Sequence, residues 1–435
     1  MKRILLITLI TLVSLFTISQ STWAILDEKK IDIREAIQKA LETNPQMQML
    51  NMNVEISKND TKIAGKLQNP NLDVFYNIGA AAKGDNQQLG VNYLIEILKR
   101  GKRKEFAKSK EQVAVNDMLF SQYGLIFEVR KAYIDLLHKK SILDIIKQQR
   151  ILAKDIYNSI KEDAKKGKVP ETEVLQAKIS LNRIIMAENN AKYNVVFSQN
   201  RFNTVMNTSD VNYDTKEDKL NGDYNDLLTI EPSNDKLEYE KIKEFAINQR
   251  YDLQKVRQEV LAAQKKLEVV KSQLVPDLQL SSGYAWTTAH NAETTSGRYG
   301  AYALGSIVNI PIVYQYKPEI KNAQLEIEKA QLKYKDTEID AIRNITDAWE
   351  RYVITRENLN FYNDEILSNS KELLQAAIKN FKERKIDFTS FLVSKKTYFD
   401  LMLDYQQALA DYYVSYAELV KEMNVIEIET ETDFI

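Results

Sequence analysis

The chain contains no cysteine, only two histidines and few residues that interrupt helices. Without cysteine, disulfides, thiolate metal sites, cysteine nucleophiles and an N-terminal cysteine that carries lipid are all excluded. Two histidines, His138 and His290, are too few for a histidine-rich metal cage. Only 12 glycines and 7 prolines occur in 435 residues. Because both residue types break helices, their scarcity predicts long, uninterrupted helices.

A surplus of charge of one sign is also absent. The 60 Lys and Arg residues balance 61 Asp and Glu residues, which gives a net charge of -1. Proteins that bind nucleic acid generally need a basic surplus to displace counterions, so we expect no nucleic-acid partner. Beyond the N-terminal segment, no run approaches the roughly 20 apolar residues of a transmembrane helix. Any part of this chain that enters a membrane must therefore do so as strands.

The N-terminus has the pattern of a secretory signal peptide. Lys2 and Arg3 precede an apolar run from Ile4 to Ile18, and the segment Ser21–Ala24 (STWA) follows with small residues at the positions that a signal peptidase reads. We predict cleavage after Ala24. The alternative is an uncleaved membrane anchor, for which the apolar run is short.

The sequence contains an internal duplication. The segment Asn69–Leu72 (NPNL) aligns with Val275–Leu278 (VPDL) at an offset of 276 − 70 = 206 positions. Farther along, Ala132-Tyr133 aligns with Ala348-Trp349 at an offset of 348 − 132 = 216. A constant offset on either side of one insertion indicates two repeats. The insertion falls in the polar stretch 287–298, which we predict to be a longer loop.

Both repeats have the same predicted plan. A helical segment ends near a proline, two short alternating segments follow, and then come a very long helix, a polar break and a return helix. The first helical segments cover residues 31–67 and 240–274, the long helices 102–160 and 319–381, and the return helices 171–206 and 389–423. The predicted organisation is a signal peptide (1–24), a first repeat (25–206), a polar linker (207–238), a second repeat (239–424) and an acidic tail (425–435).

Each long helix covers roughly 90 Å at 1.5 Å per residue, and its apolar positions alternate by three and four. In the second repeat this seam begins at Ile320, Ala323, Ile327 and Ala330. Sustained alternation of this kind is typical of knobs-into-holes packing. An ordinary two-stranded coiled coil would show the same pattern. His138 lies on the first long helix beside two lysines, and we expect it to be partly exposed.

Four segments have the alternation of strands rather than of helices. They cover about residues 71–78, 89–96, 278–286 and 299–310, and Lys83–Asn86 (KGDN) between the first two has the chemistry of a hairpin turn. Their length suits tilted strands that cross a bilayer, with one face apolar and aromatic and the other polar or small. The predicted lipid-facing residues are Leu72, Val74, Tyr76, Val91, Tyr93, Leu280, Tyr284 and Trp286. A soluble hairpin packed on a helix is the alternative.

Four strands cannot close a barrel alone, because about eight is the working minimum. An open sheet edge cannot remain in lipid. The pattern therefore indicates several protomers, and three copies would supply twelve strands.

Three short motifs, taken with their order and duplication, resemble a known family. They are the paired segments Asn69–Leu72 and Val275–Leu278, the pairs Ala132-Tyr133 and Ala348-Trp349, and Gly167–Ala177 (GKVPETEVLQA) at the predicted helical turn. With this arrangement the chain resembles the TolC-like outer membrane factor family over about residues 31–424. The resemblance implies the passive exit duct of a tripartite efflux pump or a type I secretion system.

The resemblance also implies a fold and partners. The expected fold is mainly α with a small β part: duplicated long antiparallel helical hairpins form an α-barrel in the periplasm, and four strands per protomer complete a trimeric twelve-stranded β-barrel in the outer membrane. The linker 207–238 would lie at the equator of the helical barrel. The expected partners are two further copies, a periplasmic adaptor, an inner-membrane transporter of the RND or ABC type and outer-membrane lipid. No cofactor is implied.

A narrower likeness concerns the junctions between strands and helices. The segment Ile95–Arg103 (IEILKRGKR) is similar to the junction of the cobalt–zinc–cadmium efflux subfamily, and Ile310–Tyr314 (IPIVY) is similar to its second junction. The likeness suggests a metal-ion pump as partner.

In this family, acidic residues near the helical turns can narrow the periplasmic entrance. The resemblance places Glu173 at such a position, whereas Ser390 and Val393 stand where some members carry aspartates. For Glu173 the alternative is a solvated residue favoured by the helix dipole. The candidate entrance residues are Glu173, Thr172 and Ser390, and the candidate adaptor contacts at the turns are Gly167, Val169, Arg384 and Ile386.

Two other functions share parts of this pattern. A periplasmic coiled-coil adaptor or scaffold would have the signal peptide and the heptads but no membrane strands. A secreted enzyme would need a titratable pocket, and no Ser-His-Asp order, phosphate-binding glycine loop or His-x-x-x-His pair occurs. We therefore predict no catalysis.

Overall fold

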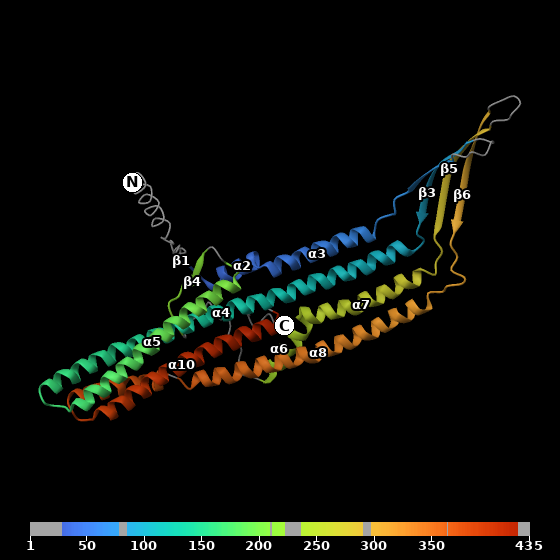
Figure 1. The fold of residues 1–435 in the computed structure, drawn as a ribbon. Helices are drawn as coiled ribbons and strands as arrows, with labels where there is room; N and C mark the ends of the chain where they lie inside the picture. The colour runs from blue at the N-terminus through green and yellow to red at the C-terminus, as the bar shows by residue number, and fades with distance from the viewer. Residues whose placement is uncertain are drawn as a thin grey trace, which may run out of the picture. The chain divides into compact units, whose positions relative to one another are not determined.

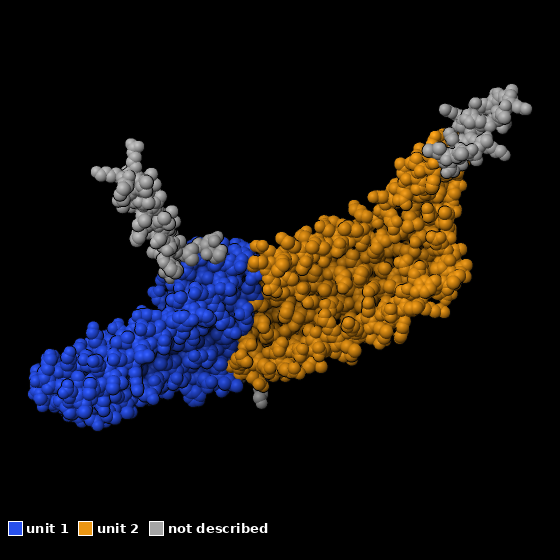
Figure 2. Space-filling model, viewed as in Figure 1, with its two compact units in different colours: residues 1–44, 125–229, 352–417 blue, residues 45–124, 230–351, 418–435 orange. Residues whose placement is uncertain are grey.

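The computed structural model describes residues 28–77, 85–208, 211–221, 236–289, 297–362 and 364–424, most of them helical (Figure 1). The chain forms two compact units (Figure 2). Unit 1 combines residues 1–44, 125–229 and 352–417, and unit 2 combines residues 45–124, 230–351 and 418–435. Each unit therefore takes segments from both predicted repeats. The predicted signal peptide, the turn at Lys83-Gly84, His290 and the acidic tail lie outside the described residues.

Unit 2 contains a four-stranded antiparallel sheet and the helices that precede and follow its hairpins. Its strands are β2 (Asn71–Asn77), β3 (Asp85–Ile95), β5 (Leu278–Ala289) and β6 (Gly297–Val308), in the order β2-β3-β5-β6. Helices α3 (Pro45–Ala64) and α7 (Tyr251–Ser272) precede the hairpins, α4 (Lys99–Lys165) and α8 (Lys317–Asn360) begin after them, and α6 (Lys236–Gln249) precedes α7. Pro70 and Pro276 stand just before each sheet segment, where a helix cannot continue. Among the described helices, none combines the length with the apolar character that a bilayer crossing demands.

Unit 1 contains the ends of two helical hairpins and a small parallel sheet. Its elements are the second part of α4, α2 (Ile33–Thr43), α5 (Glu171–Val205), α9 (Asp364–Lys382), most of α10 (Phe388–Met423), and strands β1 (Glu28–Ile31) and β4 (Asn212–Thr215). Helix α2 begins with a capping box, in which the Asp32 side chain accepts from the Glu35 backbone N–H at 2.8 Å. Near the hairpin ends, four helices share an apolar core made by Ile156, Ile160, Ala177, Ala377, Phe388 and Phe391.

The structure confirms the predicted helices and strands but divides some of the helices. The first helical segment of each repeat is broken, at Asn44 and at Arg250. The single long helix predicted for residues 319–381 is wrong, because α8 ends at Asn360 and α9 begins at Asp364. The break contains neither proline nor glycine. At the end of α8, the Tyr362 N–H donates to the Leu359 carbonyl at 2.9 Å.

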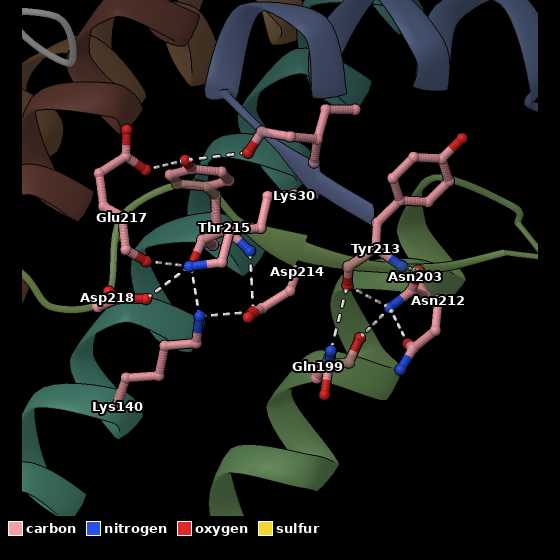
Figure 3. Close-up of polar contacts among 12 residues, drawn as sticks. Lys30, Lys140, Gln199, Asn203, Asn212, Tyr213, Asp214, Thr215, Glu217 and Asp218 are labelled. Atoms are coloured by element: carbon pink, nitrogen blue, oxygen red, sulfur yellow. Dashed lines mark hydrogen bonds and ion pairs between the residues drawn. The ribbon is translucent and has the colours of Figure 1, made fainter. Parts of the chain in front are cut away.

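The pairing of β1 with β4 was not predicted from the sequence. A polar network surrounds it (Figure 3). The Lys140 ammonium lies 2.5 Å from Asp214, and Lys30 lies 2.8 Å from Asp218. Asn203 on α5 holds the backbone of Tyr213 from both sides, since its amide donates to the Tyr213 carbonyl at 2.9 Å and its oxygen accepts from the Tyr213 N–H at 2.8 Å. Part of the predicted linker is therefore bound to α4 and α5.

His138 is buried, so the expectation of partial exposure is wrong. Only 3% of the residue is exposed. On the same stretch of α4, Lys140 pairs with Asp214, and the Ser141 hydroxyl accepts from the Leu220 N–H at 2.8 Å. Burial disfavours the imidazolium, and the nearby Lys139 repels it, so the pKa of His138 falls to about 4.

Candidate channel wall and helical-turn site

The sheet of unit 2 gathers the predicted lipid-facing residues on one face. Directly opposed residues of antiparallel strands project to the same side. Val74 is opposite Leu89, Leu89 is opposite Tyr284, and Tyr284 is opposite Tyr302. By the same register and the alternation along each strand, one face carries all eight predicted residues: Leu72, Val74, Tyr76, Val91, Tyr93, Leu280, Tyr284 and Trp286.

This apolar face is open in the single chain. Tyr302 is 87% exposed, Leu304 86% and Val74 69%. Tyr284 lies 4.8 Å from Tyr302 and 5.8 Å from Trp286, measured between ring centroids. Contiguous exposed apolar surface of this kind marks a site that contacts another apolar phase or another protein.

The other face of the sheet has a different chemistry. Most of its residues are polar or small, namely Asn71, Asp73, Gln88, Asn92, Gln279, Ser281, Gly283, Ala285, Ala301, Ala303 and Gly305. Three large apolar residues depart from the pattern on this face: Phe75, which is 62% exposed, Ile307, which is 54% exposed, and Leu94. The sheet therefore has one apolar face and one face that suits water.

Both outer strands have an open edge. In the described residues, β2 pairs only with β3, and β6 pairs only with β5. An open edge presents unpaired backbone donors and acceptors.

Ion pairs connect the residues that flank the sheet to α4. Glu96, directly after β3, lies 2.6 Å from Arg103, and Asp277, directly before β5, lies 2.7 Å from Lys99.

The two helical turns of unit 1 have the same backbone geometry. Gly167 has φ of 67° and Arg384 has φ of 59°, so both adopt the left-handed conformation that ends a helix. In each turn the next N–H reaches back five residues: Lys168 donates to the Asp163 carbonyl at 2.9 Å, and Lys385 donates to the Asn380 carbonyl at 2.8 Å. The arginine thus occupies a position that favours glycine.

Arg384 also connects the two turns. Its guanidinium donates to the Lys168 carbonyl at 2.8 Å and lies 2.9 Å from the Asp163 carboxylate. The other two predicted adaptor contacts, Val169 and Ile386, pack against the apolar core of the hairpin ends and are only partly exposed. The structure therefore brings these residues together at one end of unit 1.

Sequence reasoning missed two aspartates at this end. Asp163 binds Arg384, and Asp387 caps α10 by accepting from the Ser390 N–H at 2.7 Å. The Ser390 hydroxyl and N–H both hold the pKa of Asp387 below its usual range. The spacing Asp-x-x-Ser before an apolar run is an N-cap signal that could have identified Asp387.

The predicted entrance residues occupy the first turns of the return helices. Glu173 is half-buried on α5, Thr172 beside it is exposed, and Ser390 is exposed on α10. The side chain of Glu173 makes no hydrogen bond or ion pair with another described residue. A charge in this setting is available to solvent or to a second molecule.

No group of three or more metal-binding side chains of His, Cys, Asp or Glu occurs in the part of the chain that the structure describes. His138, the histidine that the structure describes, is buried. The candidate site therefore consists of the apolar face of the sheet and the two helical turns.

Comparisons with known proteins agree with this geometry. The family model for outer membrane efflux proteins matches residues 36–208 and 244–424. A crystal structure of CusC, described in connection with folding and transmembrane channel formation, aligns with a TM-score of 0.74 and 13% identity over 93% of this chain and 95% of that chain. The Campylobacter jejuni CmeC outer membrane channel aligns with a TM-score of 0.74 and 16% identity over 92% of this chain and 87% of that chain. The open state of the Neisseria gonorrhoeae MtrE outer membrane channel aligns with a TM-score of 0.71 and 14% identity over 90% of this chain and 89% of that chain. No curated protein sequence matches the chain.

At these identities, the solved structures show the fold. They confirm the prediction of a mainly helical chain with a small strand part, built as outer-membrane factor channels are. The family model covers well over half of the chain and confirms the predicted family. The chain therefore belongs to the outer membrane efflux protein family.

Proposed function

We propose that this chain is one protomer of a trimeric, passive export duct whose sheet lies in the outer membrane and whose helices extend into the periplasm. The observation that carries the proposal is the sheet of unit 2, with one exposed apolar face, one polar or small face and two open edges. Four strands cannot close a barrel, and open edges are not stable in lipid. Three copies would pair β2 of one protomer with β6 of the next and leave no edge.

The helices of unit 2 support the same arrangement of three protomers around a closed barrel. Helix α3 leads toward the edge strand β2, and α8 follows the edge strand β6. Each of these helices exposes apolar side chains at coiled-coil spacing, which are Met49, Met52, Ile56 and Ile63 on α3 and Leu325, Leu332 and Ile339 on α8. Pairing these two stripes between neighbouring protomers would continue the closure below the sheet.

The predicted two-repeat organisation, the signal peptide that ends at Ala24 and the absence of a lipid anchor belong to the same proposal. So do a periplasmic adaptor and an inner-membrane transporter as partners. The junction segment Ile95–Arg103 favours a metal-ion pump among the possible transporters. Catalysis is not part of the proposed function, because a passive duct only has to let the exported substrate pass.

Glu173 is proposed to line the periplasmic entrance. Three copies would place three like charges near the channel axis, and such a ring attracts cations. Replacing Glu173 with Gln should lower the cation selectivity of the channel, measured as the reversal potential in a salt gradient across a planar bilayer. A control with the same charge change at an exposed position of α8, Glu357→Gln, should leave the reversal potential unchanged. Equal selectivity of Glu173→Gln and the wild type would remove this residue from the entrance.

The function itself is tested by inserting the purified, detergent-extracted protein into planar bilayers. A duct should give discrete conductance steps. A periplasmic coiled-coil scaffold, which lacks a membrane barrel, should give none. The absence of steps from protein that is otherwise folded, as judged by its helical circular dichroism, would contradict the proposed function.

A further inference from the structure

Positive charge gathers where the helices of unit 2 meet the sheet. The segments that adjoin the strands at this end are residues 65–70, 96–104, 271–277 and 309–321. They contain three carboxylates, Glu96, Asp277 and Glu319, and nine cations: Lys66, Lys99, Arg100, Lys102, Arg103, Lys104, Lys271, Lys317 and Lys321. In the sequence at the opposite ends of the strands, residues 78–85 and 290–298 contain two charges of each sign. The surplus therefore belongs to the helix end alone.

The carboxylates of these segments do not balance the surplus. All three already have partners, which are Arg103 for Glu96, Lys99 for Asp277 and the Tyr314 hydroxyl for Glu319. The other seven cations, and Lys108 farther along α4, form no ion pair or side-chain hydrogen bond with any residue that the structure describes. Their charge is therefore uncompensated within the chain.

Some of these cations form exposed stripes on the two long helices. Arg100, Lys104 and Lys108 are spaced by four residues on α4, so they lie on one face of the helix, and all three are exposed. Lys317 and Lys321 repeat this spacing at the start of α8 and are also exposed. Like charges four residues apart repel, and cations in a first turn oppose the helix dipole. The stripes thus do not stabilise the helices, and a negatively charged partner would explain them.

Exposed apolar side chains stand beside these stripes. Leu98 is 70% exposed, Ile312 72% and Val313 98%. They lie in the connections between the sheet and the two long helices, directly before the cations in the sequence. Apolar side chains next to lysines and arginines are typical of a surface at the boundary between the acyl chains and the headgroups of a bilayer.

We propose that this end of unit 2 binds the phosphate headgroups of anionic phospholipids in the adjoining leaflet, through the stripes of α4 and α8. The inference rests on the proposed function, which places the sheet in a bilayer, and it names the class of lipid that the protein prefers. Leu98, Ile312 and Val313 would enter the acyl region, while the long cationic side chains reach the phosphates. The anionic lipid would supply the counter-charge that the chain lacks.

Competition between two lipids with the same acyl chains tests this preference in the detergent-extracted protein. Native mass spectrometry would count the molecules of dioleoylphosphatidylglycerol and dioleoylphosphatidylcholine that the protein retains from an equimolar mixture. We expect about tenfold or greater preference for the anionic lipid, because each cation near the headgroups contributes about fivefold. Raising the salt of the incubation from about 0.05 to about 0.5 M should reduce the preference, since salt screens exposed charges.

Removing the stripes should abolish the preference. The test variant combines Lys104→Gln, Lys108→Gln, Lys317→Gln and Lys321→Gln, and it should retain the two lipids almost equally. The matched control removes four exposed lysines farther along the same two helices: Lys147→Gln, Lys154→Gln, Lys329→Gln and Lys335→Gln. It has the same change in net charge and should keep the wild-type preference.

The thermal midpoint of the lipid-free protein separates a loss of lipid binding from a loss of fold. The four substitutions of the test variant should not lower it, because they remove repulsion between like charges. A lower midpoint would show that the stripes stabilise the chain itself and would count against the inference.

Three further results would overturn the inference. The first is equal retention of the two lipids by the wild type, and the second is an unchanged preference in the test variant. The third is loss of the preference in inorganic phosphate but not in chloride of the same ionic strength, which would make the stripes a site for free phosphate. Conductance in planar bilayers of phosphatidylcholine alone decides the proposed function separately, because it needs no anionic lipid.

Discussion

Arg384 has two opposing effects on the stability of the folded chain. A side chain in the left-handed region costs on the order of 1 kcal/mol, which a glycine would avoid. The contacts of the partly exposed guanidinium with Asp163 and Lys168 offset this by about 0.2–1 kcal/mol. The two effects nearly cancel, so the arginine is explained by the connection it makes between the turns rather than by stability.

Replacing Arg384 with Gly should therefore leave the thermal midpoint almost unchanged while loosening both turns. Hydrogen–deuterium exchange should become faster at residues 163–170 and 382–388, because the contact between the turns is lost. Exchange in the sheet residues should not change. Unaltered exchange at both turns would show that Arg384 does not connect them.

His138 makes stability depend on pH. Its pKa is about 4 in the folded chain and near 6.5 when unfolded, so between these values the unfolded chain binds more protons. Stability is then full above about pH 6.5 and declines as the pH falls toward 4, by about 3 kcal/mol in total. His138→Gln, which does not titrate, should flatten this part of the profile of urea midpoint against pH. Parallel profiles for the two proteins would contradict the assignment.

The faces of the sheet allow a matched test at the scale of one strand. Val91 lies on the apolar face of β3, and Gln88 lies on the other face of the same strand. A lysine on the lipid face costs about 2–4 kcal/mol near the bilayer centre. Val91→Lys should sharply reduce the protein in the outer-membrane fraction, while Gln88→Lys should leave it near the wild-type amount. Equal amounts of both variants would favour a soluble sheet.

Most elements were predictable because their signals are local. Apolar spacing identified the long helices and the strands, and Pro70 and Pro276 marked the start of each hairpin. The β1–β4 sheet was not predictable in this way, since its four-residue strands pair across about 180 positions and show no alternation. The break after Asn360 contains no proline or glycine, which were the residues used to detect breaks.

The same reason explains the wrong expectation for His138. Two neighbouring lysines suggested that His138 faces solvent, but one of them, Lys140, pairs with Asp214 of the unpredicted β4.

At the scale of the whole molecule, the proposed closed trimer would pair the open edges of β2 and β6 and cover the open stripes of α3 and α8. The most direct test of this account is to fractionate the cell envelope and measure the native mass of the detergent-extracted protein. We expect the protein in the outer membrane with the mass of three chains after correction for detergent. A water-soluble monomer or dimer in the periplasm would contradict the account and favour a coiled-coil scaffold.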